Sequence, residues 1–126
     1  MYANGYSIYK NNSINYSSKE QLLLMLVDGA VKFAKRAEES LINKDIQKSH
    51  INLTKTQDIF LELMSSLDRG TADWAEQLYR VYRFIYDKLV ETNIKKDVNI
   101  LREVMPLIID IKDVWNEAYK KSKGIK

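Results

Sequence analysis

Apolar residues recur every three or four positions along four stretches of the chain, which is the spacing of an amphipathic α-helix. In the first, from about residue 18 to 42, they are Leu22, Leu26, Ala30, Phe33, Ala37 and Leu41. The second, about 46–67, contains Leu53, Phe60, Leu63 and Leu67, flanked by Ile59 and Met64. The third, about 72–92, contains Ala75, Leu78, Val81, Ile85 and Leu89. The fourth, about 98–120, contains Leu101, Val104, Ile108, Ile111, Trp115 and Ala118.

Short polar segments separate these stretches and supply helix-ending signals. Ser18 is a suitable N-cap for the first helix, and Gly70 can adopt the left-handed geometry that ends the second. Pro106 lies inside the fourth stretch, where we expect a kink rather than a break because the apolar pattern continues in phase on both sides. Four such helices with short connections predict an all-α fold, an antiparallel four-helix bundle.

Composition supports one helical domain over residues 1–126. The chain has 126 residues, 45% of them apolar, with one proline, four glycines and no cysteine. It contains neither a secretory apolar region near its start nor an apolar run of the ~18 residues that a membrane span needs. Its 20 basic and 17 acidic residues are interspersed, as on a solvated surface. We therefore expect a cytoplasmic protein that does not insert into membranes.

The residues needed for catalysis, metal binding or nucleic-acid binding are scarce. His50 is the single histidine, so a two-histidine metal face is excluded, and we expect no metal, no cofactor and no catalytic residue. Arg80 and Arg83 stand beside tyrosines but share their helix with acids, among them Glu76 and Asp87. No coherent basic stripe results, so nucleic acid is not an expected partner.

The third predicted helix carries more aromatic surface than a bundle core needs. Tyr79, Tyr82 and Tyr86 form a second stripe at steps of three and four, and Trp74 stands at the start of the helix. One interpretation is that these tyrosines pack at the margin of the core with their hydroxyls in water. The other is that the second and third helices share an outward apolar groove that binds a partner.

The first sixteen residues form a polar segment with tyrosines and no acid. Such a segment does not fold alone, but Tyr6, Ile8 and Tyr9 can lie on the apolar groove as a lid, because tethering keeps their local concentration high. The alternative is a mobile tail whose tyrosines have no role.

The order of these motifs resembles the flagellar secretion chaperone family, the export chaperones of flagellin, from Tyr2 to about Tyr119. The first helix, SSKEQLLLMLVDGAVKFAKRA, and the second, KTQDIFLELMSSLD, are similar to the first two family helices. AEQLYRVYRFIYDKLVETNIKKD follows the family's order of a small residue, Leu, Tyr-x-aromatic and Leu. Val104 and Trp115 match its last helix. The resemblance implies a bundle that binds the disordered C-terminal segment of flagellin, prevents premature polymerisation and presents the subunit to a component of the flagellar type III export gate.

On this resemblance, and because an amphipathic client helix would lie in a groove, one set of side chains is the candidate client-binding site. Its members are Ile59, Leu63, Trp74, Leu78, Tyr79, Tyr82 and Tyr86. The resemblance also suggests that the lid segment helps to present the loaded complex to the export gate. The alternative is a non-catalytic regulatory or dimerising bundle that uses the same aromatic face. The sequence leaves open whether the free chain self-associates weakly through that face.

Overall fold

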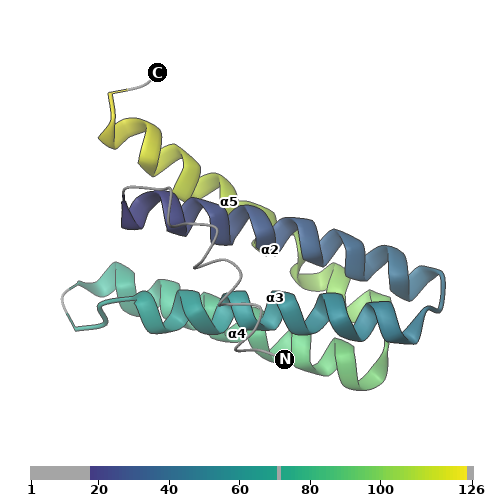
Figure 1. The fold of residues 1–126 in the computed structure, drawn as a ribbon. Helices are drawn as coiled ribbons and strands as arrows, with labels where there is room; N and C mark the ends of the chain where they lie inside the picture. The colour runs from purple at the N-terminus through teal and green to yellow at the C-terminus, as the bar shows by residue number, and fades with distance from the viewer. Residues whose placement is uncertain (1–17, 71, 125–126) are drawn as a thin grey trace.

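Four helices make up the part of the chain that the structure, a computed structural model, describes: residues 18–70 and 72–124. They are α2 (Lys19–Ile42), α3 (Ile46–Ser66), α4 (Asp73–Lys95) and α5 (Val98–Ser122). Figure 1 shows them side by side with alternating directions, which confirms the predicted all-α bundle. The predicted lid residues Tyr6, Ile8 and Tyr9 lie outside the described residues.

Side-chain caps set the starts of three helices. The Ser18 hydroxyl accepts a hydrogen bond from the Gln21 backbone amide at 3.2 Å, and the Asp45 carboxylate accepts one from the Lys48 backbone amide at 3.1 Å. Asp97 begins α5 by accepting the Asn99 amide at 2.9 Å. Each cap satisfies an amide that has no partner inside its helix. α4 differs, because its N-cap is Ala72, which makes no side-chain capping bond within the described chain.

The helix ends agree with the predicted ranges to within one turn. The largest difference is at the end of α4, which we expected near residue 92 and which continues to Lys95. It ends at Lys96, whose backbone is left-handed (φ 52°). The prediction that a left-handed Gly70 ends α3 is wrong, because α3 is capped by Leu67 with an extended backbone and the φ of Gly70 is not positive. α5 continues through Pro106 as one helix, so the prediction that this proline does not break the helix is confirmed.

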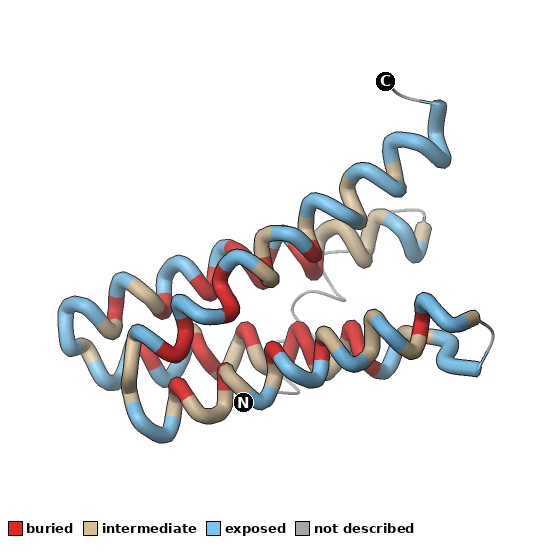
Figure 2. Tube along the Cα trace, turned by 180° about the vertical axis from the view of Figure 1, so that it is seen from behind, coloured by how far each residue is buried: buried red, intermediate tan, exposed pale blue. Residues whose placement is uncertain are grey.

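The helices form a closed ring of neighbours. α2 packs on α3, α3 on α4, α4 on α5, and α5 returns to α2. Figure 2 shows the buried residues on the sides of the helices that face one another, and the exposed ones outside. The C-terminal part of α5 is mostly exposed and leads away from the other helices (Figures 1 and 2).

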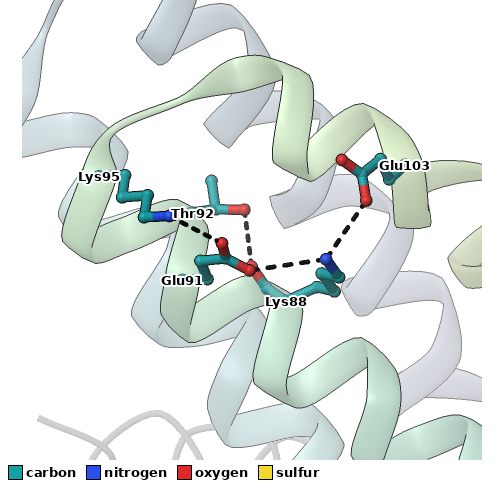
Figure 3. Close-up of polar contacts among 5 residues, drawn as sticks. All are labelled: Lys88, Glu91, Thr92, Lys95 and Glu103. Carbon is teal, nitrogen blue, oxygen red and sulfur yellow. Dashed lines mark hydrogen bonds and ion pairs between the residues drawn. The ribbon is translucent and has the colours of Figure 1, made fainter.

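An ion-pair network joins α4 to α5 on the outside of this core (Figure 3). The Lys88 ammonium lies 3.4 Å from Glu103 of α5 and 3.6 Å from Glu91 of its own helix. Lys95 pairs with the second oxygen of Glu91 at 3.0 Å. These groups are solvated, so the network favours one alignment of the two helices more than it stabilises the fold.

Candidate binding groove

An open groove of about 540 Å³ runs between α3 and α4 on the outside of the bundle. Apolar and aromatic side chains form most of its described lining, and two arginines and a serine complete it. The lining residues are Leu61, Met64, Ser65, Leu67, Arg69, Tyr79, Arg83 and Tyr86. This size and lining suit the side chains of a docked peptide or helix.

The structure brings two of the predicted client contacts, Tyr79 and Tyr86, together in this groove. Both are half-buried and rest against the core through their rings. They are seven residues apart on α4, so they lie on the same side of the helix, two turns from each other. Their placement leaves ring surface available to a partner.

Three other predicted contacts lie in the core instead. Ile59 is 2% exposed, Leu63 0% and Tyr82 1%. Tyr82 joins the stripe that α4 turns toward the other helices, which also holds Ala75, Ile85 and Leu89. In the folded chain these three side chains belong to the hydrophobic core and do not line the groove.

Tyr82 links three helices. Its ring meets Phe60 of α3 edge to face, with centroids 5.9 Å apart, and its hydroxyl accepts a bond from the Trp115 indole of α5 at 2.8 Å. Burial raises the pKa of Tyr82 to about 12, although the bond from Trp115 opposes this shift. The tyrosine is therefore a neutral hydrogen-bonding core residue.

Trp74 and Leu78 lie near the groove on α4 but are not among the described residues that line it. Trp74 is 57% exposed, which fits a side chain at the edge of a binding surface, and Leu78 packs half-buried against the core. Leu61, Arg69 and Arg83 line the groove but are not among the contacts predicted from the sequence. The spacing contained a signal for Arg83, because it stands four residues after Tyr79 and three before Tyr86.

Arg69 brings a charge from the α3–α4 connection to the rim of the groove. Its guanidinium carbon lies 3.6 Å from the centre of the Tyr79 ring, and its Nε and Nη2 atoms bond both oxygens of Glu76 at 3.0–3.3 Å. The bond to Glu76 raises the pKa of Arg69, and the reciprocal bond lowers the pKa of Glu76. A cation on an aromatic face and a fork-shaped ion pair thus fix the guanidinium in place.

Asp58, a residue of α3, is a buried carboxyl outside this groove lining. It is 8% exposed, and desolvation raises its pKa to about 6. Among the described residues there is no group of three or more His, Cys, Asp or Glu arranged to hold a metal ion. None of the described helices combines the length and apolarity that crossing a membrane requires.

Comparison with known proteins gives one consistent family. A family model described as flagellar protein FliS matches residues 2–122. The flagellar secretion chaperone FliS of Bacillus subtilis is 33% identical over 120 residues, which cover 95% of this chain and 90% of that protein. FliS of Escherichia coli, also named a flagellar secretion chaperone, is 29% identical over 109 residues, covering 85% of this chain and 80% of that one.

The match extends over nearly all of the chain and includes all four helices described above. It also includes the groove-forming segments of α3 and α4. The agreement is therefore not confined to one helix or one short motif. The chain belongs to the FliS family of flagellar proteins.

Proposed function

We propose that this chain is a flagellar export chaperone that binds the C-terminal segment of flagellin along the α3–α4 groove. The observation that carries the proposal is the open apolar groove itself, found in a chain whose curated relatives are named flagellar secretion chaperones. The resemblance in sequence motifs supplies the identity of the client.

The side chains of the groove suit a helical client. An amphipathic helix presents apolar residues at steps of three, four and seven, and Tyr79 and Tyr86 are separated by the same seven residues. Tyrosine rings give a large contact area with few rotatable bonds, so ordering them on binding costs little entropy. Leu61 and Met64 of α3 form the opposite wall. Trp74, which is exposed at the start of α4, extends the surface toward the α3–α4 connection.

The proposed action is sequestration without catalysis. A disordered segment that folds on binding must bury roughly 1,000–3,000 Å² to offset the entropy that it loses. While the client segment is buried in this way, it cannot pair with other flagellin subunits, and premature polymerisation stops. The complex then delivers the subunit to the flagellar type III export apparatus from the cytoplasm.

The direct test compares intact flagellin with flagellin that lacks its C-terminal segment. We expect the purified chain to form a complex with the intact subunit and none with the truncated one, measured by calorimetry and size exclusion. Equal binding of both forms, or of neither, would contradict the proposal. A stable homodimer that flagellin does not dissociate would support the regulatory or dimerising bundle instead.

The lid is a separate part of the proposal. Tyr6, Ile8 and Tyr9 would occupy the apolar surface until the client displaces them, and the same segment would help to present the complex to the export gate. Deletion of residues 1–16 should then raise client affinity and dye binding to the groove while export falls. If all three remain at wild-type levels, the segment is only a tail.

A further inference from the structure

Arg83 places a positive charge in the middle of the aromatic side of the groove. It follows Tyr79 by four residues and precedes Tyr86 by three, and all three side chains line the hollow. The rise from residue 79 to residue 86 is about 10 Å along the helix axis. A partner that runs along α4 therefore meets an aromatic ring, a guanidinium and a second ring within two helical turns.

The acids that pair with the arginines do not line this hollow. Asp87 receives the Arg83 Nε–H at 3.2 Å, and Glu76 holds Arg69. Neither acid is among the described lining residues, which include two guanidinium groups and no carboxylate. The described wall of the groove thus presents two guanidinium groups between apolar side chains, and each guanidinium is paired with a carboxylate just outside the lining.

Arg83 keeps donors for a partner. A guanidinium has five N–H donors; the ion pair with Asp87 engages the Nε–H, and the Tyr79 side chain accepts a further bond, which leaves donors unused. Asp87 is 59% exposed, so solvent weakens this intramolecular pair. A carboxylate that entered between the two rings would be shielded from water, and its charge-assisted bond to Arg83 would gain strength.

We propose that the groove selects a client helix in which one acidic side chain stands three or four residues from an apolar residue on each side. The acid is accepted by Arg83, and the apolar neighbours pack on Tyr79 and Tyr86. Arg69, held on the Tyr79 ring and paired with Glu76, places a second guanidinium at one end. This inference rests on the proposed function and adds to it a rule for which client segment, and which register, the chain prefers.

The test measures the affinity of the full chain for a synthetic peptide with the C-terminal sequence of the flagellin from the same organism. We compare Arg83→Glu and Arg83→Gln with Arg80→Glu, which makes the same charge reversal on α4 at a residue outside the described groove lining. In a second peptide, the acidic residue that has apolar residues three or four positions away on both sides is replaced by its amide. In a third peptide the same residue is replaced by lysine. Circular dichroism verifies that each variant is folded.

We expect Arg83→Glu to weaken binding of the native peptide by roughly tenfold or more, the range for a lost charge-assisted bond, and Arg80→Glu to leave it within about twofold. The lysine peptide should bind Arg83→Glu better than it binds the wild-type chain. If the native peptide binds Arg83→Glu and the wild type equally, the acidic-client rule is overturned while the proposed function stands. If neither the peptide nor intact flagellin binds the wild-type chain, both fail.

Discussion

The hydroxyl of Tyr82 lies in the core, where the Trp115 indole supplies its hydrogen-bond partner. The ring is 1% exposed and packs on Phe60, while the hydroxyl accepts the Trp115 indole bond at 2.8 Å. Because the contact joins α4 to α5 through one polar atom, it fixes the rotation of both helices more specifically than apolar packing would. The groove tyrosines three residues before it and four residues after it depend on this orientation.

Removing only the Tyr82 hydroxyl should lower the stability of the fold without creating a cavity in the core. Tyr82→Phe keeps the ring packing and loses one hydrogen bond, so the free energy of unfolding should fall by about 1 kcal/mol. Urea denaturation measures the change. Tyr86→Phe is the matched control, expected within about 0.5 kcal/mol of wild type because its side chain is half-buried. Equal stability of Tyr82→Phe and wild type would show that the Trp115 contact contributes nothing.

Asp58 predicts a pH dependence with a defined sign. Its pKa is raised from 3.8 to about 6 because burial disfavours the charged form, so the folded chain holds this proton more tightly than the unfolded chain. The resulting stabilisation is complete below the unfolded pKa of 3.8 and is lost as pH rises through about 6. Lowering the pH from 7.5 to 5 should therefore increase this residue's contribution to the free energy of unfolding.

The variant Asp58→Asn isolates this effect. It should be more stable than wild type at pH 7.5, by about 1–3 kcal/mol, with a smaller difference at pH 5. Urea midpoints at the two pH values give the comparison. Glu76 and Glu91 act in the opposite direction, because bonds from Arg69 and Lys95 lower their pKa values. Their contribution to the free energy of unfolding is lost only as the pH falls below the usual glutamate pKa of 4.5. An unchanged pH slope in Asp58→Asn would rule out the buried carboxyl as its source.

Among the described helices, α4 begins with the weakest local signal and carries both tyrosines of the groove. Ala72 has an extended backbone, φ −158° and ψ 150°, which is the conformation of a capping residue, but it lacks a side-chain acceptor. Asp73 and Glu76 in the first turn stabilise the helix, because their negative charges lie near the positive end of its dipole. Supplying the missing acceptor is thus a simple way to strengthen the helix.

The substitution Ala72→Ser should raise the free energy of unfolding by about 0.5–1 kcal/mol, because a serine hydroxyl can accept an unpaired amide of the first turn. Thermal and urea unfolding measure it. The reverse change is Ser18→Ala at the start of α2, which removes an observed cap and should lower stability by a similar amount. If the Ala72→Ser variant is no more stable than wild type, the first turn of α4 is already satisfied in another way.

At the scale of helices, sequence reasoning predicts this protein well because local rules dominate. Ser18 and Asp97 cap their helices as their side-chain chemistry predicts, and the range of each helix follows from its apolar period. The end of α4 was predicted less well because Lys96 adopts a left-handed backbone that is uncommon for residues other than glycine. Ala118, predicted to lie inward, is exposed where α5 extends away from the bundle.

At the scale of the whole molecule, the binding surface could be predicted only in part. The helical period shows which residues share a face of a helix. When a helix carries two apolar stripes offset by three residues, the stripes lie on neighbouring faces, and only packing against other helices decides which stripe is buried. Tyr82 and Tyr79 illustrate this point, since they differ by three positions and the structure puts one in the core and the other in the groove. Arg69 could not be assigned to the groove from the sequence, because it belongs to the α3–α4 connection and no periodic pattern predicts the path of such a connection.

Client binding should stabilise the whole fold in proportion to its affinity. A ligand that binds only the folded chain adds RT ln(1 + [L]/Kd), or about 2.7 kcal/mol at one hundred times Kd. The flagellin C-terminal peptide should therefore raise the unfolding temperature progressively with its concentration, measured by differential scanning fluorimetry. Tyr86→Ala should reduce this shift, whereas Phe84→Ala, an exposed position outside the described groove lining, should not. An equal loss in both variants would place the client elsewhere.

The ring of neighbouring helices closes between the first and the last of them in the described chain, α2 and α5. During synthesis, α2, α3 and α4 can pair in the order in which they emerge, but the sides of α2 and α4 that α5 covers must wait for its 25 residues. At ~5–20 residues per second, that delay lasts on the order of seconds. For that time the nascent protein carries an uncovered apolar face of its own, the same hazard that it is proposed to suppress in flagellin.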